Sequence, residues 1–183
     1  MIFDDALPYS PSAAKTRVIC VALDGSKNSE QAFDWCMQHL CRDSSESGGI
    51  LDEIVLLNCR APPPRLVIPS GEEMFAEAAV YSNDDYFKWM SEQAKLESHN
   101  MLKKYGYRVM EGNKGVVVRC LALVGDPRKE LCDVAKELKA EMFVVGTRGM
   151  GLIQKAMIGS VSDHLLHHLE CPVIVVHERH ASQ

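Results

Sequence analysis

The residues best suited to chemistry are three glycines and a serine in the last quarter of the sequence. They are spaced Gly-x2-Gly-x9-Gly-Ser and occupy Gly146, Gly149, Gly159 and Ser160. Glycine lets backbone N–H groups approach a phosphate because no Cβ intervenes, and a helix beginning near Ser160 would add free donors and a partial positive charge. The spacing therefore predicts a nucleotide phosphate site, although the same glycines would also suit turns and close packing. Arg148 lies inside this loop, where it could face either a terminal phosphate or solvent.

Five apolar runs, separated by helical patterns, must position this motif. Most of the runs are continuously apolar, as expected of strands covered on both faces. The predicted strands are Val18–Leu23, Ile54–Leu57, Val116–Val124, Met142–Val145 and Val173–Val176. One helix should start near Ser29, a longer one should run past Phe87 to near Gly106, a third should enter through Pro127, and a fourth should stop before Pro172. This alternation predicts a single doubly wound α/β domain with a five-strand parallel sheet, helices on both faces, and ligands at the carboxyl ends of the strands.

Composition narrows the classes of partner. The 183 residues carry a formal net charge of -5 and no basic tract, which argues against nucleic acid or an anionic membrane as a partner. No apolar run approaches the ~20 residues of a membrane span, and residues 1–15 lack the apolar region of a signal peptide. The seven cysteines form no Cys-x2-Cys pair, so reduced thiols and a cytoplasmic location are expected.

Two segments do not fit the regular elements. Residues 42–49 are expected to form a solvated turn. Residues 61–85 combine three consecutive prolines with a helix-compatible stretch at 72–80. This insert could form a mobile flap near the site or a plain surface insertion.

Four short motifs, taken in order along the chain, resemble the universal stress protein family. They are Val21–Ser26 after the first strand, Val124–Pro127 before the third helix, the glycine motif, and Cys171–Val176 at the end. The resemblance covers residues 16–178, which leaves 1–15 as an N-terminal extension and 179–183 as a tail. It implies the strand order 3-2-1-4-5, and the complete glycine motif is typical of the family's ATP-binding branch.

The same resemblance implies where a nucleotide would lie. The end of the first strand would meet the nucleotide, Cys59 would lie beside the adenine, and the glycine motif with Val161 would cradle ribose and phosphates. Asp24 could contact the ligand, act with Ser26 at a strand-to-helix turn, or do both. Asn58 departs from the family, where histidine is common. The predicted nucleotide-binding set is Ala22, Leu23, Asp24, Cys59, Gly146, Arg148, Gly149, Gly159, Ser160 and Val161.

The sequence shows no set of residues suited to rapid catalysis. There is no Gly-x4-Gly-Lys-Ser/Thr motif and no evident base, so any Mg²⁺ should be held through the phosphates of ATP. His164, His167 and His168 have helical spacings that could suit a metal but fit helix-end surface residues better. The expected function is an ATP-dependent regulatory or stress-response switch. The alternatives are a slow ATP-hydrolysing or adenylylating enzyme and a scaffold that binds no nucleotide.

A homodimer is the expected assembly. In the implied strand order the last strand, within residues 173–177, is an apolar edge, and such edges invite pairing with another chain. The alternative is that residues 1–15 or the 61–85 insert cover this edge.

Overall fold

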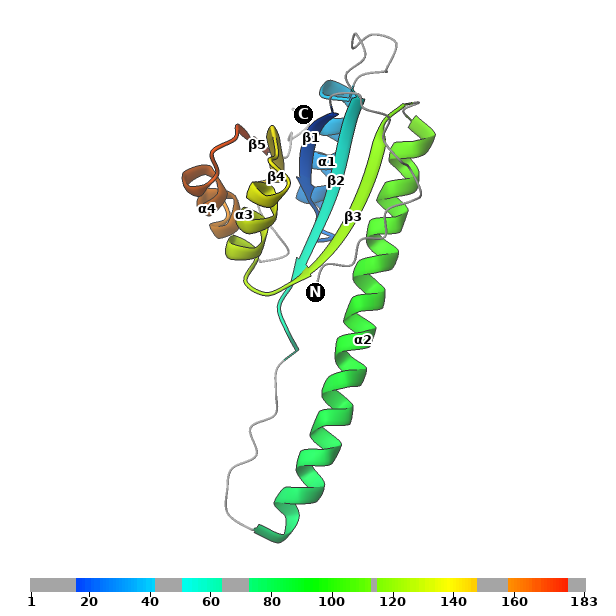
Figure 1. Ribbon diagram of the computed structural model, residues 1–183, viewed down its shortest axis with the longest axis vertical. Helices are drawn as coiled ribbons and strands as arrows, with labels where there is room; N and C mark the ends of the chain where they lie inside the picture. The colour runs from blue at the N-terminus through cyan, green and yellow to red at the C-terminus, as the bar shows by residue number, and fades with distance from the viewer. Residues whose placement is uncertain (1–15, 42–50, 64–72, 113–114, 148–157, 178–183) are drawn as a thin grey trace, which may run out of the picture.

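The computed structural model describes residues 16–41, 51–63, 73–112, 115–147 and 158–177, with the backbone alone for 73–83. Within these ranges the chain forms one sheet flanked by helices on both faces (Figure 1). The predicted extension 1–15, the turn 42–49 and the tail 179–183 lie outside the described residues, as do Arg148 and Gly149.

The sheet has five parallel strands in the order β3-β2-β1-β4-β5, which confirms the predicted order. The strands are β1 Thr16–Ala22, β2 Leu51–Arg60, β3 Val117–Val124, β4 Met142–Gly146 and β5 Val173–Val176. β2 is longer than predicted because it pairs along both edges, from Leu51 opposite Thr16 to Arg60 opposite Val124. The paired partners continue the strand through Asp52, Glu53 and Asn58, whose polar side chains interrupt the apolar run that the sequence displays.

Four helices cover the sheet in two pairs. The helices are α1 Lys27–His39, α2 Glu73–Gly112, α3 Pro127–Glu137 and α4 Ser160–His168. One apolar core joins the sheet to α1 and α2, and a second joins the opposite face to α3 and α4. Pro127 does open α3, with Asp126 as its N-cap.

The first helix turns the side that carries Ala32, Phe33 and Cys36 toward the core. Phe33 and Cys36 are buried in the core, whereas Trp35 is only half-buried and stacks on His39 with ring centroids 4.8 Å apart. The aromatic contact with the core comes instead from Phe33, whose ring packs edge-on against Tyr105 of α2.

The second helix corrects two predictions. α2 runs for 40 residues, so residues 73–85 of the predicted insert are helix, and the helix continues through Gly106. Gly106 is tolerated inside it because the glycine faces β3, where an added Cβ would already be 3.4 Å from Cys120 Sγ. The N-terminal part of α2 extends beyond the carboxyl ends of the strands (Figure 1). Among the described residues, no helix is both long and apolar enough to span a bilayer.

Candidate functional site

The carboxyl ends of β1 and β4 lie side by side at the centre of the sheet. β1 pairs with β2 on one edge and with β4 on the other, so the connections that leave these two strands diverge. This is the topological switch point at which open α/β sheets bind their ligands. A ligand at this point would therefore meet Ala22 at the end of β1, Asp24 in the turn after it and the residues that follow Gly146.

The start of α4 is held against the end of β4. The Gly159 N–H donates to the Thr147 carbonyl at 2.6 Å, and the Ser162 hydroxyl donates to the carbonyls of both Thr147 and Gly159, at 3.2 and 2.9 Å. Thr147 is fixed in turn, because its N–H donates to the Val176 carbonyl at 3.0 Å. The position of the helix N-terminus is thus set by backbone and buried hydroxyl contacts.

Among the described residues, no side chain caps this helix N-terminus. Gly159 is the N-cap residue, in an extended conformation and without a capping side-chain hydrogen bond. Because helix-initial N–H groups have no partner within the helix, Ser160 and Val161 can present theirs to an anion, together with the helix dipole. The exposed Ser160 side chain adds a hydroxyl. These residues bear out the local structure predicted from the second half of the glycine motif.

Three of the predicted site residues lie on one face of the sheet. Ala22, Cys59 and Val161 are each half-buried against the same core cluster, on the side covered by α3 and α4. They come from β1, β2 and α4, so the fold brings together residues that are far apart in the sequence.

Leu23 lies differently. Its side chain is buried in the core on the α1 and α2 face. Its N–H donates to the Leu57 carbonyl at 2.7 Å, and its own carbonyl accepts a hydrogen bond from Asn58 Nδ2 at 2.7 Å. Leu23 and Asn58 therefore hold the end of β1 in place, and the buried Asn58 amide has a structural partner of its own.

Asp24 and Ser26 make separate hydrogen bonds in the turn that follows β1. The Asp24 carboxylate accepts from the Ser26 N–H at 2.9 Å, and the Ser26 hydroxyl caps α1 by accepting from the Ser29 N–H at 3.2 Å. Gly25 between them has a φ of +81°, a region that L side chains rarely adopt. The capping side chain is thus Ser26, whereas Asp24 stays half-exposed at the switch point.

Gly146 has a packing role that the motif does not reveal. A Cβ at this residue would lie 2.7 Å from both the carbonyl carbon and the oxygen of Asn28, and 3.0 Å from the Ser29 backbone nitrogen. Gly146 therefore allows the first turn of α1 to approach β4. Among the described glycines of the motif, Gly146 fits the close-packing interpretation and Gly159 the helix-start interpretation.

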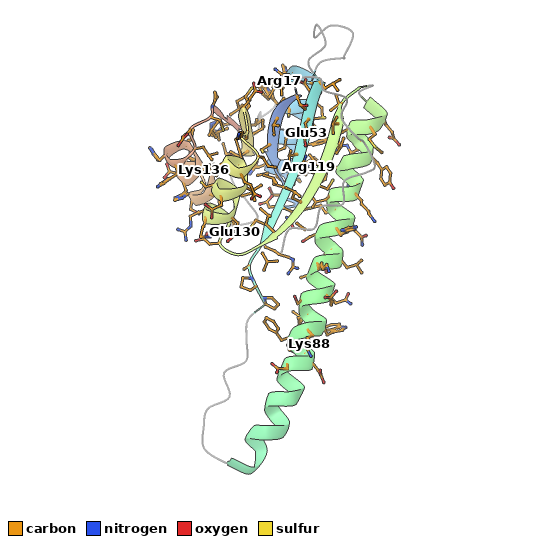
Figure 2. The ribbon with its side chains drawn as sticks, in the orientation of Figure 1. Arg17, Glu53, Lys88, Arg119, Glu130 and Lys136 are labelled. Carbon is orange, nitrogen blue, oxygen red and sulfur yellow. The ribbon has the colours of Figure 1, made fainter. Side chains whose placement is uncertain are left out.

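The neighbouring turn between β3 and α3 carries paired charges, because Asp126 lies 2.8 Å from Arg128 and Glu130 lies 3.5 Å from Lys129. Burial, Glu130 and Asp126 raise the pKa of the Cys59 thiol to about 11, and Arg60 only partly opposes them. The Cys59 Sγ also lies 3.8 Å from the Gly125 carbonyl oxygen. The thiol is therefore neutral at physiological pH, a state suited to apolar contact and unsuited to nucleophilic attack. Figure 2 shows Glu130 at the end of α3 nearest the carboxyl ends of β2 and β3.

The histidines of α4 form a surface group. The rings of His164 and His168 stack with centroids 3.8 Å apart, and His167 lies 3.7 Å from Asp163 on the exposed side of the helix. Within the described ranges, no group of three or more metal-ligating side chains converges.

Two residues of the site were missed from the sequence. Thr147 and Ser162 lock the α4 N-terminus to β4, and both are buried. Ser162 lies three residues after the N-cap glycine, a spacing at which a hydroxyl reaches the cap carbonyl. Thr147 carries no comparable signal, because its contacts are made by its backbone.

The parallel sheet, its strand order and the helices on both faces define a doubly wound α/β domain, and comparison with known proteins identifies the family. The sequence profile of the universal stress protein family matches residues 15–177, and the chain belongs to that family. Its relatives include a universal stress protein A-like protein of Arabidopsis thaliana, 27% identical over 80% of this chain and 77% of the relative. Another is the universal stress protein Sll1388 of Synechocystis, 28% identical over 86% of this chain and 96% of the relative.

Solved structures of the family share the fold. The universal stress protein UspA of Lactobacillus plantarum superposes with a TM-score of 0.67 at 16% identity, covering 89% of this chain and 99% of its own. A family protein of Arabidopsis thaliana, solved with AMP bound, gives 0.56 at 21% identity, over 89% of this chain and 92% of its own. A universal stress protein solved in complex with cAMP gives 0.52 at 22% identity, covering 91% and 98%.

Proposed function

We propose that this chain binds ATP in the crevice between the ends of β1 and β4 and acts as a nucleotide-dependent regulatory or stress-response switch. The observation that carries the proposal is the uncapped N-terminus of α4, fixed beside the switch point by Thr147 and Ser162. Such a terminus favours a phosphate. The AMP and cAMP complexes of two family members support an adenine nucleotide as the ligand.

The charges around the crevice favour one direction for the nucleotide. Phosphates belong at Gly159–Val161, with Arg148 and Gly149 as further candidates from the loop, because the N–H donors and helix dipole lie there. The base then belongs on the apolar side, near Cys59 and Ala22, where the thiol is neutral. Asp24 is then the side chain available to the ribose. Any Mg²⁺ is expected to be held by phosphate oxygens and water.

A switch is favoured over an enzyme by the chemistry of the described residues. Rapid phosphoryl transfer needs a positioned water, bound metal and a group that orients the nucleophile, and the crevice side chains described above offer a neutral thiol and one half-exposed carboxylate. We therefore expect turnover far below the ~10 per second of a median enzyme.

The test begins with the protein as purified. Acid extraction followed by chromatography should release an adenine nucleotide, and a steady-state assay with Mg-ATP should then measure its turnover. Ordinary enzyme rates would favour the alternative of an ATP-hydrolysing or adenylylating enzyme.

A substitution at the helix start tests the site itself. Gly159→Val places a branched side chain at the N-cap and should weaken ATP binding in calorimetry at least about ten-fold, or ~1.4 kcal/mol. Gly112→Val, at the far end of α2 with no heavy atom within 4 Å of its Cβ position, is the control. Equal affinity of the two variants would remove the glycine motif from the argument.

The same proposal includes assembly and location. β5 is the last strand of the sheet and its four residues are half-buried, so pairing of two β5 edges would give a homodimer. Val175→Lys should shift the mass in light scattering toward one chain of 20.4 kDa and leave ATP affinity intact. All seven cysteines are free thiols, which suits the reducing cytoplasm.

A further inference from the structure

Two cysteines lie together at the C-terminal end of α1. Cys36 belongs to the last turn of the helix, and Cys41 follows the C-cap residue Leu40. The Cys41 N–H donates to the Cys36 carbonyl at 3.3 Å. Because the bonds along this path bend at each atom, the two Cα atoms lie within roughly 7 Å of each other, close to the roughly 4.4–6.8 Å that a disulfide spans.

The side chains of the two cysteines are also in contact. Both pack against the core cluster on the α1 and α2 face of the sheet. The Cys36 thiol donates to the Cys41 sulfur, and this hydrogen bond together with burial raises the pKa of Cys36. The Cys41 thiol in turn donates to Met37 Sδ at 3.7 Å. Backbone and side-chain contacts therefore hold two free thiols at a separation from which a disulfide can form with little backbone movement.

The two thiols differ in their access to solvent. Cys36 is fully buried, with 0% of its surface exposed, whereas Cys41 is partly exposed. An oxidant from solution therefore reaches the Cys41 sulfur first and meets Cys36 only through it. The Arg17 guanidinium donates to the Leu40 carbonyl at 2.7 Å, so the residue before Cys41 is fixed and the pair keeps its geometry.

From this geometry we propose that Cys36 and Cys41 form an oxidation site, in which a hydroperoxide oxidises Cys41 and Cys36 then closes an intrachain disulfide. In the first step the Cys41 thiolate attacks one peroxide oxygen and the O–O bond breaks. The other oxygen leaves as an alcohol or water after taking up a proton, and Cys41 becomes a sulfenic acid. In the second step the Cys36 sulfur attacks the Cys41 sulfur, the S–O bond breaks, and hydroxide leaves as water with the Cys36 proton. The two sulfurs are thus oxidised and the peroxide is reduced.

The oxidation site lies at the opposite end of α1 from the nucleotide crevice. The Ser26 cap at the other end of the helix is about 20 Å from Cys41 at 1.5 Å per residue. Figure 2 shows Arg17, which holds the Leu40 carbonyl, at the end of the sheet remote from Glu130. The proposal therefore stands or falls independently of ATP binding.

One tryptic peptide reports the reaction. Trypsin cleaves after Lys27 and Arg42, so residues 28–42 carry both cysteines and no others. The reduced full-length protein is treated with hydrogen peroxide, alkylated under denaturing conditions, digested and analysed by mass spectrometry. We expect this peptide to lose the mass of two hydrogen atoms and to escape alkylation, and dithiothreitol should reverse both changes. Cys120 is the internal control, because it is also half-buried but its thiol donates to the Leu102 carbonyl; it should still be alkylated.

Two variants test the order of the steps. Cys36→Ala removes the second sulfur, so Cys41 should stop at the sulfenic acid and be trapped by dimedone. Cys41→Ser removes the exposed sulfur, so Cys36 should stay reduced at the same peroxide concentration. Circular dichroism checks that both variants fold, and the result with the unchanged protein does not depend on them. An unlinked 28–42 peptide after treatment with a large excess of peroxide, or a disulfide that joins either residue to a different cysteine, would overturn the proposal.

Discussion

The substitution Gly146→Ala separates the packing role of the glycine motif from its proposed ligand role. An added Cβ would meet the Asn28 carbonyl carbon and oxygen at 2.7 Å and the Ser29 nitrogen at 3.0 Å. These are backbone atoms in the first turn of α1, so no side-chain rotation relieves the overlap. Ordinary carbon contacts are about 3.5–4.0 Å, and α1 and β4 would therefore have to separate by about 1 Å.

The cost follows from overpacking a buried contact. Forcing an extra carbon into a well-packed site typically costs about 1–3 kcal/mol. In a domain of this size each kcal/mol lowers Tm by roughly 2–4 °C, so a fall of roughly 2–12 °C is expected. ATP should bind more weakly as well, since the displaced turn carries Asp24 and the end of β1.

The matched control is Gly112→Ala, where nothing lies within 4 Å of the added Cβ. Alanine is the better helix former, so stability should be unchanged or higher by up to about 1 kcal/mol. Both proteins would be unfolded by heat and by urea, with the free energy of unfolding compared at equal m-value. If Gly146→Ala were as stable as Gly112→Ala, the packing argument for the first glycine would be refuted.

Three further outcomes are expected from single contacts. Ser26→Ala removes the hydroxyl that accepts from the Ser29 N–H and should cost about 0.5–2 kcal/mol in urea unfolding; an unchanged midpoint would contradict the cap. Arg17→Met leaves the buried Asp52 carboxylate without the guanidinium that donates to both of its oxygens at 2.8 Å. The free energy of unfolding should therefore fall by about 3–5 kcal/mol, and a fall below about 1 kcal/mol would contradict the role of this pair. Because the pKa of Cys59 is raised to about 11 from an ordinary 9.0, its thiolate fraction at pH 8 should be about 100-fold lower than that of free cysteine. Alkylation of Cys59, located by mass spectrometry, should therefore rise as the pH approaches 11. Rapid alkylation at pH 8 would show that the thiol is not shielded in this way.

The sheet could be predicted from the sequence because its signals are local and repeated. Each buried strand is an apolar run, and Pro127 and Pro172 limit helices at places where the chain must turn. The order of the strands came from the family resemblance, and the parallel pairings confirm it. The full length of β2 escaped prediction because Asp52 and Asn58 are buried polar residues whose partners, Arg17 and the Leu23 carbonyl, belong to another strand or the turn after it.

The length of α2 escaped prediction for a related reason. A helix with one covered face displays a single apolar periodicity, whereas α2 has apolar residues on two opposite sides. One side packs against β3, and the other is exposed and carries Trp89, Leu96 and Tyr107. The two periodicities overlap in sequence, so neither is clear. Because of the prolines at 62–64, the predicted loop was extended too far, into residues that belong to the helix. Separation of these faces requires the contacts with the sheet.

The glycine motif shows how residues of one pattern acquire different physical roles. Gly146 is required where two backbones meet, at the contact between β4 and α1, on the face away from the proposed ligand. Gly159 instead leaves the α4 N-terminus without a capping side chain of its own, on the face of the sheet where Ala22, Cys59 and Val161 are packed. Gly146 brings the turn after β1 close to β4, and Gly159 is the residue at which α4 begins. A substitution at Gly146 should therefore lower both stability and affinity, whereas one at Gly159 should lower affinity with the smaller effect on stability. The ratio of the two effects, measured on the same pair of variants, distinguishes a site built by packing from one built by direct contact alone.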